Sequence, residues 1–115
     1  MKPTNELKLT ERINELAFER KVARRMLQTN PTLKESVECA HDYIVSSLLL
    51  STIYDGVGEI HEARATINPA FRLYNTFKDQ GVEVLNSVEQ ERLERFAATY
   101  KPEIKEINYF ELDEC

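Results

Sequence analysis

Apolar residues recur at every third or fourth position over most of the chain, a spacing that predicts amphipathic helices rather than strands. The first helix is expected to begin at Thr4 or Thr10 and to end near Gln28, because Asn30 and Pro31 follow it. One face of this helix carries Leu9, Ile13, Leu16, Ala23 and Leu27. No glycine or proline interrupts that face, so one long helix is predicted.

The second predicted helix has its own start signal. Thr32 and Glu35 have the Thr-x-x-Glu spacing of a capping box, in which each side chain binds the backbone N–H of the other residue. The helix is expected to run to about Tyr54, with Gly56 taking the left-handed conformation that ends it. Beyond Tyr43 its apolar residues point almost all round, which predicts a central helix covered on most sides.

A third helix is predicted over residues 58–79, before Gly81, and it contains a proline. Its single apolar stripe consists of Ile60, Ala63, Ile67, Ala70, Phe71, Tyr74 and Phe77. Pro69 removes one backbone hydrogen bond, but the stripe keeps its phase across Asn68 and Pro69. We therefore expect one kinked helix; the alternative is two short helices, with Asn68 capping the second.

The fourth helix is expected to begin at Asn86 or Ser87, because Asn86 with Glu89 and Ser87 with Gln90 both have the spacing of a capping pattern. Lys101 and Pro102 end it. The four helices together predict an all-α, four-helix bundle-like domain with a kinked third helix.

The last segment, residues 103–115, fits neither the helix nor the strand period. It mixes bulky apolar residues, Tyr109 and Phe110 among them, with five acidic residues. Exposing those apolar side chains would make the segment adhesive. We expect a short acidic C-terminal tail that docks on the bundle, at the basic half of the first helix, or on a partner.

The composition narrows the fold class and the kind of partner. The chain has 115 residues, the length of a single domain, and its 3 glycines and 4 prolines are few for the many turns of an all-β fold. Its formal charge is -5, from 15 basic and 20 acidic residues. That charge disfavours sequence-independent binding to nucleic acid or to an anionic membrane surface. We expect neither as a partner.

The two cysteines and the absence of leader patterns bear on location. Cys39 and Cys115 are far apart in the sequence, so no disulfide framework is indicated. The sequence shows no signal-peptide pattern, and serines and a threonine interrupt its longest apolar stretch. We expect reduced thiols and a cytoplasmic location.

The first helix has a second apolar face, although a single face is enough to pack it against the rest of the bundle. Phe18, Val22 and Met26 follow each other at intervals of four residues, on nearly the opposite side from the first face. The predicted interaction surface combines this ridge with nearby cations and the tail: Phe18, Arg20, Val22, Arg24, Arg25, Met26, Tyr109 and Phe110.

The charges of the first helix are also unusual. Acidic residues follow one another at intervals of four in its first half, and basic residues do so in its second half: Glu11, Glu15, Glu19, then Arg20 with Arg24 and Lys21 with Arg25. Like charges at this spacing repel each other in an isolated helix. Two antiparallel copies would place each acidic half against a basic half, as a two-fold dimer requires. Alternatively, the other helices of the same chain supply the partners.

A metal-dependent activity is the alternative from another functional class. Glu35-x-x-Glu38 and Glu59-x-x-Glu62 resemble in part the paired carboxylates of the all-α NTP pyrophosphohydrolases related to MazG. The resemblance implies that these four glutamates hold Mg²⁺ against nucleotide phosphates. The same spacing recurs three more times in this acidic chain, and the helical phase turns Glu35, Glu38 and Glu62 toward solvent.

The sequence therefore favours a non-enzymatic protein that acts through protein–protein contacts, as an adaptor or an inhibitor, and that forms a homodimer or higher homo-oligomer. No catalytic residue, metal site or cofactor is expected. An oligomeric sponge that binds a small anion or nucleotide through its arginines is a further alternative. Three polar residues on apolar faces, Arg20, His41 and Tyr74, are expected to be hydrogen-bond anchors in the core or the edge of a ligand pocket.

Overall fold

The computed structural model describes residues 3–29 and 32–100, and within them the side chains from residue 8 onward. This part of the chain contains no strand and forms four helices: α1 (Pro3–Leu27), α2 (Leu33–Gly56), α3 (Ile60–Asp79) and α4 (Ser87–Tyr100). The predicted all-α, four-helix fold is confirmed. The predicted tail, with Tyr109 and Phe110, lies outside the described residues.

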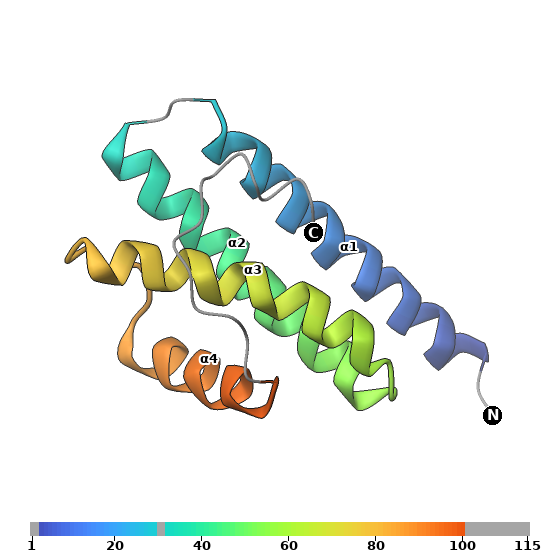
Figure 1. The fold of residues 1–115 in the computed structure, drawn as a ribbon. Helices are drawn as coiled ribbons and strands as arrows, with labels where there is room; N and C mark the ends of the chain where they lie inside the picture. The colour runs from blue at the N-terminus through green and yellow to red at the C-terminus, as the bar shows by residue number, and fades with distance from the viewer. Residues whose placement is uncertain (1–2, 30–31, 101–115) are drawn as a thin grey trace.

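The helices are arranged around α2. Helices α1 and α3 both pack along α2, and α4 packs against α3 and α2 (Figure 1). The central position predicted for the second helix is confirmed. Figure 1 shows α1 and α4 at opposite edges of the molecule, whereas the first and last helices of a closed up-and-down bundle lie side by side. The outer side of α1 is therefore not packed against α4.

Local side-chain hydrogen bonds fix where two of the helices begin. At the start of α2, the Glu35 N–H donates to Thr32 Oγ1 at 3.2 Å, and the Thr32 N–H donates to Glu35 Oε1 at 3.0 Å. At the start of α4, the Glu89 N–H donates to Asn86 Oδ1 at 2.8 Å, and the Asn86 N–H donates to Glu89 Oε1 at 3.0 Å. The capping boxes predicted at Thr32 and Glu35 and at Asn86 and Glu89 are confirmed, and Ser87 is the first residue of α4 rather than its cap.

The turn between α2 and α3 differs from the prediction. Gly56 is the last residue of α2 and does not have a positive φ. The left-handed residue is Gly58, with φ 84°. The Val57 N–H donates to Ile53 O at 3.1 Å, so the helical hydrogen bonding continues past the expected end and the chain reverses two residues later. Gly81, after α3, has φ 78°, as its position after the third helix suggested.

Helix α3 continues through its proline. Pro69 lies inside the single helix Ile60–Asp79, so the alternative of two short helices is wrong. The stripe explains this, because Ile67 and Ala70 on either side of Pro69 are both fully buried. A break at Pro69 would remove one of these two residues from the core, which outweighs the loss of one backbone hydrogen bond.

The core is drawn from all four helices and from the segment before α4. Its buried apolar residues include Leu16 and Leu27 of α1, Tyr43 and Ile44 of α2, Ile67, Leu73 and Phe77 of α3, Leu85, and Leu93 of α4. Three of the four buried serines of α2, Ser46, Ser47 and Ser51, are small enough to let neighbouring helices approach closely. None of the described helices combines the length and the apolar character that crossing a membrane requires.

Candidate functional site

The outer face of α1 carries the largest run of exposed apolar side chains on one helix. Phe18 is 67% exposed, Met26 48% and Val22 43%. Leu16 and Leu27 on the inner face are almost fully buried, so α1 is apolar on two sides and only one of them meets the bundle. We call Phe18, Val22 and Met26 the α1 ridge. The structure brings these three predicted residues together on one exposed face.

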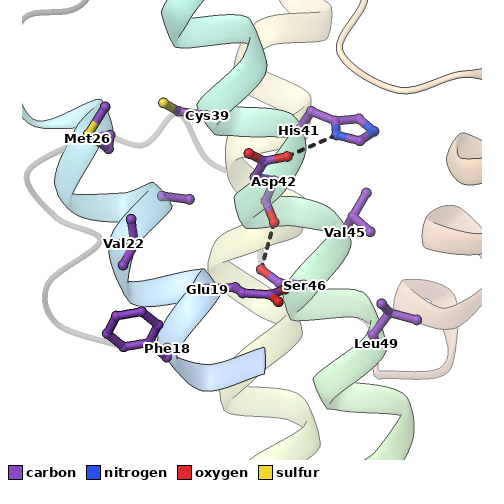
Figure 2. Close-up of a pocket in the computed structure, with 11 residues that line it drawn as sticks. Phe18, Glu19, Val22, Met26, Cys39, His41, Asp42, Val45, Ser46 and Leu49 are labelled. Atoms are coloured by element: carbon purple, nitrogen blue, oxygen red, sulfur yellow. Dashed lines mark hydrogen bonds and ion pairs between the residues drawn. The ribbon is translucent and has the colours of Figure 1, made fainter. Parts of the chain in front are cut away.

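A groove runs along one side of the α1 ridge, between α1 and α2. It has a volume of about 610 Å³ and is lined from α1 by the ridge, Glu19 and Ala23. From α2 it is lined by Cys39, His41, Asp42, Val45, Ser46 and Leu49 (Figure 2). Leu49 is 40% exposed and adds another uncovered apolar surface to the groove. The groove is mostly apolar, with the carboxylates of Glu19 and Asp42 as its acidic groups.

A second hollow lies on the other side of the ridge. It has a volume of about 360 Å³ and is lined by the α1 ridge together with Lys21 and Arg25. The ridge therefore stands between two hollows, one with acidic groups and one with basic groups. An apolar projection between two depressions is a shape that a second helix can pack against, with its own side chains entering the hollows.

Arg20, which the sequence placed both on the interaction surface and among the core anchors, is turned into the bundle. Its Nε donates to Ser47 Oγ of α2 at 2.7 Å. Its Nη2 donates to Tyr43 Oη of α2 at 3.1 Å and to the backbone oxygen of Thr66 of α3 at 3.2 Å. The guanidinium carbon also lies 5.0 Å from the centre of the Tyr43 ring. Arg20 is thus a structural anchor that joins three helices.

The other two cations predicted for the surface are placed differently from Arg20. Arg25 is exposed and borders the basic hollow beside Phe18 and Val22. Arg24 is half-buried, so its position is intermediate between the core and the surface. The exposed basic groups next to the α1 ridge are therefore Lys21 and Arg25.

The two remaining polar anchors connect α4 to the rest of the bundle. His41 Nε2 of α2 lies 3.0 Å from Glu89 Oε2 of α4, and Tyr74 Oη of α3 donates to Glu94 Oε2 of α4 at 3.0 Å. Burial alone would raise the pKa of Glu89, but the Asn86 N–H and His41 outweigh it and lower that pKa. Burial, with the hydrogen bond to Glu94, raises the pKa of Tyr74. Both contacts are explained by helix packing.

The four glutamates of the magnesium alternative are not brought together. All four are exposed, and Glu35 serves the cap of α2. Glu38 lies in the second turn of α2, whereas Glu59 and Glu62 lie beyond its far end, at the start of α3. At 1.5 Å per residue, the helix between Glu38 and Gly56 separates the two pairs by about 27 Å. Within the described residues, no group of three or more histidine, cysteine, aspartate or glutamate side chains could hold a metal ion.

Cys39, the thiol in the groove, is poorly suited to nucleophilic chemistry. Burial and the nearby carboxylates of Asp42, Glu35 and Glu38 raise its pKa above the ordinary value of a thiol. The thiol therefore stays protonated at neutral pH, and the protonated form is a weak nucleophile.

Sequence reasoning named His41 as a possible pocket edge, and His41 does line the groove, but it missed the other groove residues of α2. Val45, Leu49 and Cys39 line the groove, but α2 is apolar almost all round. Its periodicity shows that it is central and does not show which of its sides remains uncovered. These residues are left uncovered because α4 packs away from α1. That position is a property of the tertiary fold, so no pattern in the sequence indicates it.

Comparisons of the chain with protein families, with curated proteins and with solved structures find no match.

Proposed function

We propose that this chain is a non-enzymatic interaction protein that works as a homodimer, and that two copies associate through the α1 ridge and the adjoining groove. The observation that carries the proposal is the exposure of Phe18, Val22 and Met26 on the long face of α1 that the other described helices leave uncovered. Contiguous exposed apolar surface of this kind marks a site of protein contact.

The energetic argument rests on burial of the ridge in both copies. Full burial of a phenylalanine, valine or methionine side chain is worth about 1.5 to 3 kcal/mol relative to leaving it exposed. A symmetric dimer covers three such residues twice, because each copy presents the same ridge. Burial of the apolar ridge is the main attractive contribution to the dimer. It opposes the free-energy cost of fixing two chains relative to each other.

Charge supports a second copy as the occupant of this face. Glu11 and Glu15 precede the α1 ridge and Glu19 follows its first residue, whereas Lys21 and Arg25 border the ridge on its basic side. Glu15 is paired with Arg12 of the same helix, with Arg12 Nη1 and Glu15 Oε1 3.2 Å apart. Glu11, Glu19, Lys21 and Arg25 form no ion pair within the described part of the chain. Another α1 supplies both signs of charge that this face requires.

Light scattering over a dilution series tests the proposal. The intact chain should have a mass near twice 13.4 kDa at high concentration. Val22→Glu should shift it to 13.4 kDa, because it places a charge in the middle of the ridge. Val88→Glu is the matched control, since Val88 of α4 is 57% exposed and remote in sequence from the ridge. A chain that remains monomeric at every concentration would overturn the proposal.

We also propose a role and a cellular location for the homodimer. A homodimer of this kind acts as an adaptor or an inhibitor, through contacts between its surface and a protein partner. The cytoplasm is the proposed location, because the half-buried Cys39 is a free thiol and a reducing compartment keeps thiols in that state.

A further inference from the structure

We infer that the two copies of α1 pair in an antiparallel orientation about a two-fold axis next to Phe18, with Glu11 of each copy opposite Arg25 of the other. The inference rests on the proposed function, because it specifies the partner orientation at the same face. In this register one ion pair, between Glu11 and Arg25, forms twice.

The register follows from how Glu11, Phe18 and Arg25 are spaced along α1. Glu11 and Arg25 are each seven residues from Phe18, one before it and one after it. Seven residues are almost two helical turns, with a drift of about 20°, so all three side chains lie on one stripe of α1. Glu11, Phe18 and Arg25 are all exposed along this stripe. The stripe therefore reads acidic, aromatic, basic, with the aromatic residue at its midpoint.

Symmetry converts this order into a preferred orientation. A two-fold axis perpendicular to α1 at Phe18 exchanges the positions of Glu11 and Arg25, so opposite charges meet at both ends of the contact. A parallel pairing would instead place Glu11 against Glu11 and Arg25 against Arg25. The like charges would then lie close together within the interface, where they are costly. The charge order thus favours the antiparallel pair.

The surroundings of the stripe agree with this orientation. Phe18 is the most exposed residue of the α1 ridge, at 67%, and it borders both hollows. On the two-fold axis, each Phe18 can pack against its symmetry mate, as aromatic rings do at many interfaces, while Val22 and Met26 are covered by the first half of the other copy's α1, near positions 14 and 10. Glu11 and Arg25 have no ion-pair partner within the described residues, in contrast to the pair formed by Arg95 and Glu91 on α4 at 3.1 Å.

Charge reversal tests the orientation. Glu11→Arg and Arg25→Glu should each weaken the dimer about tenfold, because each creates two like-charged contacts. The double variant Glu11→Arg/Arg25→Glu should restore the dissociation constant to within about threefold of the unaltered chain. The matched controls are Glu91→Arg and Arg95→Glu, at residues 68% and 78% exposed on α4, which should leave the dimer unchanged. Analytical ultracentrifugation measures all of these constants.

The outcomes separate this inference from the proposed function. If the unaltered chain dimerises and Val22→Glu abolishes the dimer, but the single reversals at residues 11 and 25 have no effect, the register is wrong and the interaction surface stands. If the chain never dimerises, the proposed function fails first. Circular dichroism of each variant shows whether the exposed substitutions leave the fold intact.

A cross-linking experiment measures the same register directly. Glu11→Cys and Arg25→Cys variants are prepared with Cys39→Ser and Cys115→Ser, mixed, and treated with a short bis-maleimide. Antiparallel pairing predicts that cross-links join a Glu11→Cys chain to an Arg25→Cys chain in excess over cross-links between identical chains. Predominant cross-links between identical chains would overturn the inference.

Discussion

Arg20 of α1 donates a hydrogen bond to Ser47 in the middle of α2, with 2.7 Å between Nε and Oγ. The bond requires Ser47 to be small and fully buried, so that the guanidinium can reach across the helix interface. The same guanidinium also binds α3 through the backbone oxygen of Thr66. The relative positions of α1, α2 and α3, and so the outward orientation of the α1 ridge, depend in part on this one side chain.

The first prediction concerns the stability that Arg20 provides. Arg20→Ala should lower the free energy of unfolding by about 2 to 3 kcal/mol, because it leaves Ser47 and Tyr43 without their charged donor. Arg20→Lys should lower the free energy of unfolding by less, because the ammonium group keeps the charge but cannot reproduce the planar fork of the guanidinium. Arg12→Ala, at an exposed arginine of the same helix, should change stability by less than about 0.5 kcal/mol. Urea unfolding followed by circular dichroism measures each difference; equal losses for Arg20→Ala and Arg12→Ala would contradict the prediction.

The features that could be predicted from the sequence are those that depend on neighbouring residues. Thr32 and Glu35 are three residues apart and bind each other, so their spacing alone indicates where α2 begins. Phe18, Val22 and Met26 lie opposite Leu16 and Leu27 on any regular helix, so the second face of α1 also follows from periodicity.

The features that could not be predicted depend on tertiary packing. Arg20 lies on the inner face of α1, but its partners Ser47 and Thr66 are 27 and 46 residues away, and only the fold brings them close. The sequence places the left-handed residue after α2 at Gly56, two residues before its actual position at Gly58, because both glycines suit a helix end and the position of α3 decides between them. The groove depends on where α4 packs, which periodicity does not specify.

The second prediction concerns these glycines. Gly58→Ala and Gly81→Ala should each destabilise the fold by about 1 to 2 kcal/mol, because a Cβ atom is strained at φ 84° and 78°. Gly56→Ala should stabilise it by about 0.5 to 1 kcal/mol, since Gly56 is helical and a Cβ there would meet no atom within 4 Å. The three positions are equally open, so only the backbone conformation differs. Thermal unfolding of the three variants gives the comparison, and a destabilising Gly56→Ala would contradict it.

The third prediction concerns nucleotide hydrolysis. The chain should release no pyrophosphate from nucleoside triphosphates in the presence of Mg²⁺, because α2 holds Glu38 far from Glu59 and Glu62. A hydrolytic metal site needs several carboxylates around one ion. The assay uses a panel of ribo- and deoxyribonucleoside triphosphates, with the Glu38→Gln variant as the control for contaminating enzymes. Turnover that Glu38→Gln abolishes would show that the two pairs do act together.

The last prediction concerns the pH dependence of the contact between α2 and α4. The pKa of Glu89 in the folded chain is lowered from its ordinary value of 4.5, and the Asn86 N–H and the bond to His41 outweigh the opposing effect of burial. A lowered folded pKa means that the carboxylate stabilises the fold above pH 4.5 and loses this contribution as the pH falls through the lowered pKa.

Glu89→Gln should therefore reduce the free energy of unfolding by about 1 kcal/mol at neutral pH, and the difference from the unaltered chain should disappear in acid below the pKa of Glu89. His41 Nδ1 also lies 3.5 Å from Asp42 Oδ1, so the histidine keeps one carboxylate neighbour in the variant. Glu91→Gln is the matched control on α4, because Glu91 is 68% exposed and its pair with Arg95 contributes little. Urea unfolding at a series of pH values measures both variants. A Glu89→Gln effect that is the same in acid as at neutral pH would show that the contact with His41 does not depend on the ionised carboxylate.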